Sequence, residues 1–339
     1  MKKKIICGAL LLILLIGGFI AWKIFGPTVS APQGKYFYIK TGSTYSEVKT
    51  ALLDQHIISS EYFFDRIARQ ANYTTAVKAG RYEIRNGTSV FNLIRMLRSG
   101  KQSPVNLVIT KLRTREDLAA KIAANFECDS ASVIEILSNT DSLRKYGLEE
   151  NTAMTAVIPN TYSILWNTSA AKIFRKLFTE KEKFWNAERM KKAAAINLTP
   201  EQVYTMASIV EEETNKEEDK GKIASVYMNR IQSGQRLEAD PTIKFALKNF
   251  GLKRIRKSHI DACAGSPFNT YYVKGLPPGP ICTPSSKTID AVLNAPVTNY
   301  LFFVARPDWS GLSNFTSSYE EHQVNARNYQ HFLDSINIK

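Results

Sequence analysis

The sequence predicts an α+β protein. It begins with one apolar helix, continues through a small module of strands and helices, and ends in a mainly helical region with a short antiparallel strand pair. Three observations lead to this fold class: an uncharged apolar run near the N-terminus, short alternating strand and helix patterns over residues 36–112, and helical periodicity over most of residues 113–339. The chain has 339 residues, 44% hydrophobic and 22% charged, so it can bury cores of ordinary globular size.

The N-terminal segment has the features of a membrane anchor. Three lysines precede an uncharged apolar run that begins at Ile5 and is close to the length that crosses a bilayer as a helix. We predict a cytoplasmic tail over residues 1–4 and an anchor in membrane lipid over residues 5–25. The N-terminus lies inside because more lysines precede the run than follow it. The rest of the chain would then lie outside the cytoplasmic membrane, in the periplasm if the cell has an outer membrane. The alternative is a signal peptide cleaved after Ala31, although a proline follows that site.

The composition favours anionic partners. Lys and Arg number 45 against 31 Asp and Glu, a formal charge of +14, which suits phospholipid headgroups, wall polymers or nucleic acid. An exported position argues against nucleic acid, and the sequence has no Walker loop, no glycine-rich dinucleotide fingerprint and no zinc-ligand spacing. We therefore expect no nucleic-acid partner, no cofactor and no metal. Cys263 and Cys282 could form a disulfide or remain separate thiols in a core.

Residues 26–35 contain prolines and glycines and are predicted to be a linker, and residues 36–112 then alternate strand and helix signals. Strands are predicted at 36–39, 79–84 and 105–109, and helices at a start capped by Ser43, at 62–67, and from Ser89 to Gly100. The stretches "TGSTYSEV" and "NGTSVFNLI" resemble the LysM-like modules of wall-binding proteins. A generic spacer domain is the alternative reading of this region.

The remainder divides into a helical connecting region, 113–198, and a final domain, 199–339. Amphipathic runs at 172–185 and 222–231 support helices on both sides of this boundary. The final domain closes with a predicted strand pair, 300–305 and 314–316, followed by a C-terminal helix.

One carboxylate falls in an unusual place on a predicted helix. Thr199-Pro200-Glu201 is a strong helix start, and at about 100° per residue Met206, Val210 and Ile209 define an apolar stripe. Glu211 and Glu212 fall on the polar side, whereas Glu213 lies about 20° from the centre of the stripe. Burial there would raise its pKa, as a general acid requires near neutral pH. In the alternative, the helix frays by Val210 and all three glutamates are solvated.

Several blocks then coincide in order. "MASIVEEET", "IASVYMNRI", "RLEADPTI", "FNTY", "GLPPGPI" and "YLFFVA" resemble the endolytic murein transglycosylases of the MltG (YceG-like) type, over roughly residues 200–335. The resemblance implies a membrane-anchored lyase that cleaves MurNAc–GlcNAc bonds inside nascent glycan strands, leaves 1,6-anhydro ends and so limits strand elongation. Its partners would be peptidoglycan strands and peptidoglycan synthases of the elongation or division machinery, with no metal and no cofactor.

The same resemblance implies which residues act. The family's catalytic glutamate belongs to a Glu-x-Glu-Thr motif, which places it at Glu213, with Glu211 as the second choice. Glu213 would protonate the glycosidic oxygen and then accept the proton of the 6-hydroxyl group as that oxygen attacks. Asp240 is the best second acid, either supporting the site or forming a turn before a proline. The family's Phe-Pro-Asp-Thr-Tyr block is altered, because Asn160 replaces the acid.

Other polar residues are candidates for substrate binding. Asn269, Thr270 and Tyr271 offer an amide, a hydroxyl group and an aromatic ring suited to a sugar, or alternatively form a turn. Asn229 and Arg230 could reach carboxylates of the substrate, or lie on a solvated helix edge.

The remaining histidines and the competing functions complete the sequence analysis. His259 and His322 stand alone and are predicted to be structural. Two alternative functions stay open: a hydrolytic muramidase in which Asp240 positions water, and a non-catalytic wall-binding or division scaffold.

Overall fold

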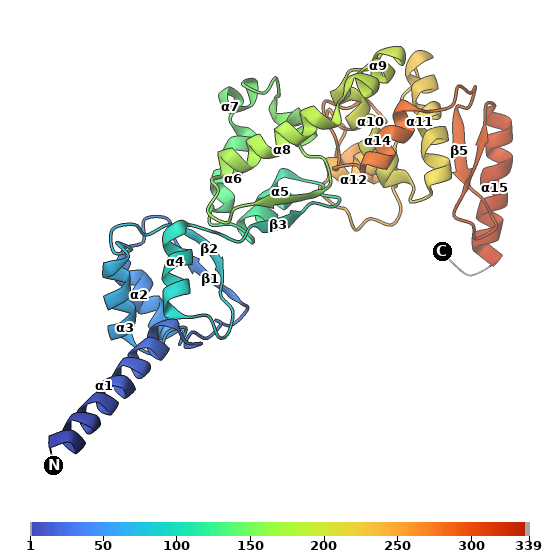
Figure 1. The fold of residues 1–339 in the computed structure, drawn as a ribbon. Coiled ribbons are helices and arrows are strands. Elements are labelled where there is room, and N and C mark those ends of the chain that lie inside the picture. The colour runs from blue at the N-terminus through green and yellow to red at the C-terminus, as the bar shows by residue number, and fades with distance from the viewer. Residues whose placement is uncertain (1, 336–339) are drawn as a thin grey trace. The chain divides into compact units, whose positions relative to one another are not determined.

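The computed structural model describes residues 2–335 (Figure 1) and divides into two compact units, each described by itself. The first unit comprises the chain up to Leu107 together with Asn125–Cys128 and Ser163–Ser169. The second unit comprises Val108–Ala124, Asp129–Tyr162 and the chain from Ala170. The division into a module, a connecting region and a final domain made from the sequence stays a prediction.

The chain begins with the helix α1 (Lys2–Phe25), none of whose residues is buried. Within residues 2–335 it is the one helix long and apolar enough to cross a membrane. At 1.5 Å per residue it is roughly 36 Å long. Its end is marked by the Gly26 N–H, which donates to the Trp22 carbonyl at 2.8 Å.

The first unit contains β1 (Tyr36–Ile39), α2 (Tyr45–Asp54), α3 (Glu61–Gln70), β2 (Gly80–Glu83), α4 (Val90–Ser99) and most of β3 (Val105–Val108). β1 and β2 pair antiparallel, with Phe37 opposite Tyr82 and both side chains buried. These elements lie where the sequence predicted them, but the cap of α2 is Thr44 rather than Ser43. The Thr44 hydroxyl group accepts the Glu47 N–H, and the Glu47 carboxylate accepts the Thr44 N–H, which makes a capping box.

Two features of this unit bear on the sequence predictions. The α4 helix starts after the Ser89 cap and stops at Gly100, whose φ of 72° is left-handed, as predicted. The segment 26–35, predicted to be a linker, packs on the unit, because Val29 is buried and its N–H donates to the Thr88 carbonyl at 2.9 Å. The likeness of this unit to a LysM module stays a prediction.

The second unit is helix-rich. Its first part holds α5 (Arg115–Ala123), α6 (Ser130–Ser138), α7 (Thr140–Arg144), a 3-10 helix (Glu150–Ala156), α8 (Ala170–Phe184) and α9 (Ala187–Ala195). The strand β4 (Thr161–Ile164), whose first two residues belong to this unit, interrupts the region that the sequence predicted as helical, because alternating burial at Tyr162 and Ile164 follows a period of two.

The later part of the unit builds its main core around α10 (Pro200–Glu213). Every residue from Val203 to Val210 is buried, because α11 (Glu217–Gln232) and α14 (Ser286–Leu293) pack against α10 on different sides. The single apolar stripe predicted for this helix is therefore too narrow. Its polar positions are filled by small hydroxyl side chains that bond the helix backbone, such as Ser208 to the Thr205 carbonyl at 2.7 Å.

One element boundary differs from the prediction. α11 begins at Glu217, five residues before the predicted helix, because three acidic residues fill its first turn, where the helix dipole favours negative charge. The basic segment after Asn249 contains α13 (Lys257–Ala262). α12 (Asp240–Ala246) lies between them.

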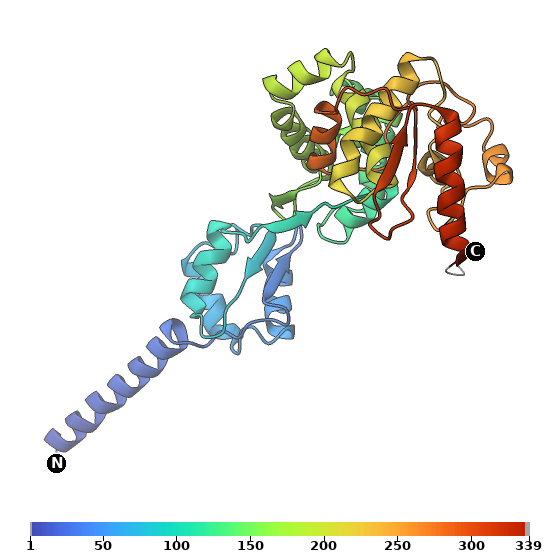
Figure 2. The same ribbon diagram turned by 90° about the vertical axis from the view of Figure 1, so that its right-hand side faces the viewer.

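The predicted strand pair and final helix are confirmed. β5 (Phe302–Ala305) and β6 (Ser313–Thr316) pair antiparallel, with Phe303 opposite Phe315. They lie beside α15 (Tyr319–Ser335) in both Figure 1 and Figure 2.

Candidate active site

The end of α10 positions the candidate acid. Thr199 caps the helix with a capping box shared with Gln202, and Pro200 follows at its first turn, as predicted. The helix does not fray at Val210. It continues to Glu213, and Thr214 then turns to an extended conformation while its N–H still donates to the Val210 carbonyl at 3.3 Å. Glu213 is therefore held on the final turn of a rigid element.

The Glu213 carboxyl group lies in an environment that favours its protonated form. The side chain is only partly exposed, and loss of hydration raises its pKa from 4.5 to about 7. The Tyr227 hydroxyl group donates to Glu213 Oε1 at 2.6 Å and opposes this shift, whereas the negative charge of Asp240 adds to it. Lys244 and Arg230 lower the pKa more weakly. The result is a carboxyl group that can release and accept a proton near neutral pH.

The Glu213 side chain lines a cavity of about 290 Å³. The walls of this cavity are formed by α10, α11, the start of α12, the segment around Tyr271, β5 and α15. Nine residues line it, seven with titratable side chains and two, Leu237 and Phe303, that are apolar: Glu213, Tyr227, Arg230, Leu237, Glu238, Asp240, Tyr271, Phe303 and His322. Other hollows of the molecule are larger, but this cavity contains Glu213, the carboxyl group whose pKa lies near neutrality.

A second carboxyl group faces the same cavity. Asp240 is the first residue of α12, after the Ala239 cap, and its Oδ1 accepts a hydrogen bond from the Tyr271 hydroxyl group at 2.6 Å. Burial, together with Asp240, raises the pKa of Tyr271, which keeps this phenol a donor. The sequence proposed Asp240 and Tyr271 for separate reasons, and the structure brings them together.

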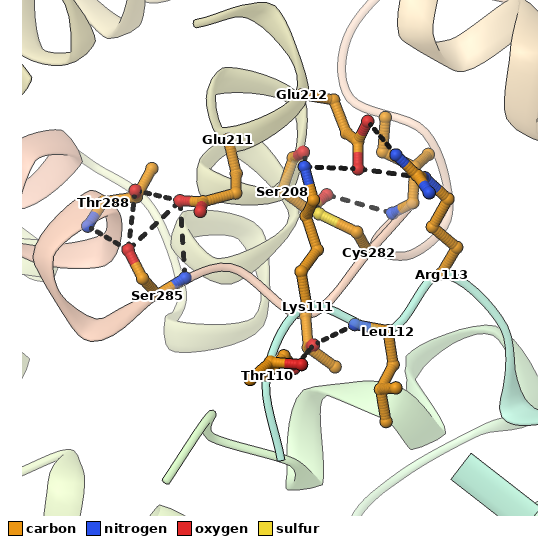
Figure 3. A network of polar contacts seen from close by, with 12 residues as sticks. Thr110, Lys111, Leu112, Arg113, Ser208, Glu211, Glu212, Cys282, Ser285 and Thr288 are labelled. Carbon is orange, nitrogen blue, oxygen red and sulfur yellow. Dashed lines mark hydrogen bonds and ion pairs between the residues drawn. The ribbon is translucent and has the colours of Figure 1, made fainter. Parts of the chain in front are cut away.

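Glu211 does not line the cavity and points toward Ser285 and Thr288 (Figure 3). Its Oε2 accepts hydrogen bonds from the Ser285 hydroxyl group at 3.1 Å and from the Thr288 hydroxyl group, both at the start of α14. Lys220 lies 3.5 Å from the same oxygen. Glu211 therefore joins α10 to α11 and α14.

Glu212 points to the opposite side of the helix (Figure 3). Arg113 binds it through two nitrogens, Nε at 3.1 Å and Nη2 at 3.0 Å, and Lys111 Nζ lies 3.2 Å away. The segment that carries these cations also pairs with the chain after Cys282: the Thr283 N–H donates to the Leu112 carbonyl at 2.7 Å. Both glutamates predicted on the polar face are thus covered by protein rather than solvated.

The residues next to Tyr271 are structural. The Asn269 amide group donates to the Ile260 and Cys263 carbonyls at 2.9 and 3.1 Å, and the side chain is fully buried. The Thr270 hydroxyl group accepts the Ala239 N–H at 3.0 Å and is also buried. Together they fix the turn that presents Tyr271, and neither lines the cavity.

Asn229 and Arg230 differ in the same way. The Asn229 amide group donates to the Thr298 and Tyr300 carbonyls at 3.0 and 2.9 Å, which ties α11 to the segment before β5. Arg230 lines the cavity, but its guanidinium group donates to the Leu237 and Leu301 carbonyls, each at 2.7 Å. Its charge therefore acts on the cavity while its hydrogen bonds stabilise the wall.

Sequence reasoning missed three polar cavity residues, Tyr227, Glu238 and His322. Tyr227 was counted only as part of an apolar helix face, and no local signal indicates that its hydroxyl group meets Glu213. His322 was predicted to be structural, yet it lines the cavity, stacked on Phe302 with ring centroids 5.1 Å apart. Burial and, more weakly, the charge of Arg230 lower its pKa, which favours the neutral imidazole.

The remaining predictions on ligands concern cysteine and metal chemistry. Cys263 and Cys282 are buried free thiols rather than a disulfide, and Cys282 Sγ donates to the Ser208 carbonyl at 3.3 Å. Among residues 2–335 no group of three or more His, Cys, Asp or Glu side chains is placed to hold a metal ion.

The fold and cavity define a class: a helix-rich protein with a carboxyl group at the end of a largely buried helix, whose pKa burial raises to about 7. The model of the YceG-like family matches residues 37–328, and the chain belongs to this family. The resemblance inferred from the motifs is thereby confirmed.

The chain is similar to proteins named endolytic murein transglycosylase. The Bacillus subtilis (strain 168) protein is 27% identical over 93% of this chain and 91% of its own length. The Streptococcus pneumoniae serotype 2 protein is 27% identical over 85% of this chain, which spans 57% of that longer relative. A crystal structure of a yceG-like protein from Listeria monocytogenes has a TM-score of 0.57 and 26% identity, covering 86% of this chain and 99% of that one.

Proposed function

We propose that this protein is an endolytic peptidoglycan transglycosylase. It cleaves MurNAc–GlcNAc bonds within glycan strands and leaves a 1,6-anhydro end, so it is a lyase that limits strand elongation. Family membership and the names of the two relatives support the activity. The observation that carries the chemistry is the Glu213 carboxyl group with a pKa of about 7 in a cavity.

In the proposed reaction Glu213 acts twice. As a neutral acid it gives its proton to the glycosidic oxygen while positive charge builds at the anomeric carbon of the muramic acid. The resulting carboxylate accepts the proton of the 6-hydroxyl group as that oxygen bonds to the anomeric carbon. The proton count returns to its starting value and no water is consumed, so one carboxyl group suffices.

Neighbouring residues give Glu213 its two roles. The Tyr227 hydrogen bond fixes the carboxyl group and favours the carboxylate that appears after the first proton transfer. Asp240 is a negative charge in the same cavity, where it favours the cationic transition state and the protonated form of Glu213. Tyr271 holds the Asp240 carboxylate through the hydrogen bond at 2.6 Å.

The proposed position of the enzyme follows from α1. Residues 5–25 anchor the chain in the cytoplasmic membrane, with the N-terminus inside and the cavity outside, where peptidoglycan and its synthases are found. The length of the helix and the lysines before the apolar run support this topology.

Product analysis tests the proposal. Purified full-length protein in detergent is incubated with glycan strands, and the ends are identified by mass spectrometry. Anhydro ends are expected. Reducing ends would instead indicate the muramidase, with Asp240 positioning water, and no cleavage under conditions where the protein binds strands would favour the scaffold.

A further inference from the structure

A groove between α3 and α4 of the first unit lies far along the chain from Glu213. Its volume is about 570 Å³, larger than that of the candidate active site. Apolar side chains form its floor and three cations stand at its edge; the lining residues are Ile67, Ala71, Ala76, Lys78, Phe91, Ile94, Arg95, Arg98 and Ser99. This combination suits a molecule with an apolar chain and an anionic group.

The cations of the groove are available for a ligand. Arg95 and Arg98 are exposed, and within residues 2–335 neither forms an ion pair with an acidic side chain. Lys78 is also exposed, and its Nζ donates to the Ser99 carbonyl at 3.3 Å. Because residues three and four apart share one helix face, Phe91, Arg95 and Arg98 line the same side of α4. Along this side of α4 the lining of the groove thus passes from the aromatic ring of Phe91 to two guanidinium groups that, within residues 2–335, form no ion pair with a carboxylate.

The groove begins beside the end of the apolar helix α1. The ring of Phe91 lies 5.4 Å from that of Phe25, the last residue of α1. The ring of Phe63, on α3, lies 6.5 Å from that of Phe19, which is about 9 Å further down the helix axis. The start of α3 therefore lies beside the last turns of α1.

The exposed side chains at this end are those that favour a membrane interface. Tyr62, next to Phe63, is 70% exposed, and Phe91 is 40% exposed. Aromatic residues concentrate at headgroup depth, and arginine and lysine nearby bind anionic lipids. If α1 crosses a bilayer, these rings lie at its surface and the groove opens from that surface.

We propose that the groove between α3 and α4 binds an anionic phospholipid of the membrane that holds α1. An acyl chain lies on the floor formed by the partly exposed Ile67, Ala71 and Ala76, and the lipid phosphate meets Arg95 and Arg98. The inference rests on the proposed membrane anchoring. It adds a lipid site to the enzyme, distinct from the cavity that contains Glu213, and it gives the positive charge of this unit a specific partner.

The test uses the full chain in lipid nanodiscs that contain a photoactivatable phosphatidylglycerol, compared with a photoactivatable phosphatidylcholine. After illumination, labelled peptides are mapped by mass spectrometry. Labelling by phosphatidylglycerol is expected on peptides of α3 and α4, at least about tenfold above that by phosphatidylcholine, because two cations contribute to binding. Equal labelling by the two lipids, or labelling confined to α1, would overturn the proposal.

Variants separate charge from shape. The double variant Arg95→Gln, Arg98→Gln should lose the phosphatidylglycerol preference, and Ala76→Phe, which fills the groove, should lower labelling by both lipids. Lys172→Gln with Arg175→Gln is the matched control, because it removes two exposed cations from α8 of the second unit. Equal loss in the control would contradict a specific site, as would suppression of the labelling by excess inorganic phosphate.

The anchoring itself is tested separately. The intact mass of the protein extracted from its native membranes shows whether the residues before Ala31 are retained. A cleaved chain would refute the anchoring, whereas an intact chain without lipid labelling in nanodiscs would refute the groove alone.

Discussion

The last turn of α10 presents three consecutive glutamates to two kinds of surroundings. Glu211 accepts hydrogen bonds from hydroxyl groups and Glu212 binds cations, and these partners come from segments distant in the sequence. Both carboxylates therefore connect α10 to other parts of the fold. Glu213 meets one tyrosine and a cavity, and its pKa rises to about 7. The comparison teaches that the chemistry of a glutamate on a buried helix is decided by the donors that neighbouring segments supply.

The largest expected effect is on catalysis. Glu213→Gln should lower the rate of anhydro-end formation by about 10²–10⁴-fold, because the amide group cannot donate a proton to the glycosidic oxygen or accept one afterwards. Mass spectrometry of the products measures this rate. Glu211→Gln, the matched control two residues away, should keep the rate within about tenfold of the parent. If the control loses as much as Glu213→Gln, the assignment of the acid is wrong.

The next effect is on stability as a function of pH. Because the folded state raises the pKa of Glu213 from 4.5 to about 7, its contribution to the free energy of unfolding is complete below pH 4.5 and is lost as pH rises through about 7. Glu213→Gln removes this loss. The stability of the variant minus that of the parent should therefore grow by about 3 kcal/mol between acid and alkaline pH. Urea unfolding across this range measures the difference, and a flat difference would show that Glu213 is not desolvated.

A smaller loss of stability is expected on the opposite face of the helix. Glu212→Gln leaves Arg113 and Lys111 without their carboxylate and should lower the free energy of unfolding by about 1–2 kcal/mol. Chemical denaturation at neutral pH measures it. The alkaline limb of the pH–rate profile should stay in place, since this carboxylate does not face the cavity; a displaced limb would link Glu212 to the proton transfer.

The smallest expected effects are shifts of the pH–rate profile. Substitutions of Tyr227 and of Asp240, the two neighbours of Glu213, should shift the profile in opposite directions. Tyr227 lowers the pKa of Glu213 and Asp240 raises it. Tyr227→Phe should therefore move the alkaline limb of the pH–rate profile to higher pH, and Asp240→Asn should move it to lower pH, each by less than about one pH unit. Rates measured on one strand preparation across pH test this. Shifts in the same direction would mean that the limb reports another group.

Local signals predicted the elements that have local causes. Thr199 and Pro200 fixed the start of α10, and Ser89 and Gly100 fixed both ends of α4, because caps act within one turn. The position of Glu213 in line with the apolar stripe also follows from helix geometry alone. The role assigned to Glu213 came from the resemblance of several motifs. The family match confirms that resemblance, and the role of Glu213 stays a prediction.

The rest depends on contacts between segments distant in the sequence. Glu212 is covered by Arg113, which lies about a hundred residues earlier in the chain. No sequence pattern around either residue indicates that the two form a pair. The same holds for Tyr227 and His322, whose meeting with the cavity depends on how α11 and α15 pack. Asn269 and Thr270 look like sugar-binding residues by type, but they bond backbone groups that hold Tyr271 in place.

The contacts of the segment 110–113 with α10 and with the chain after Cys282 also limit where a truncated form of the enzyme can begin. A fragment starting at Thr199 would leave Glu212 without its two cations and the Thr283 N–H without the Leu112 carbonyl. Such a truncation would remove supports directly behind the helix that carries Glu213. A fragment that begins before Thr110 keeps these supports. The smallest fragment expected to fold with Glu213 in place is therefore much longer than the segment from residue 200 that carries the recognisable motifs.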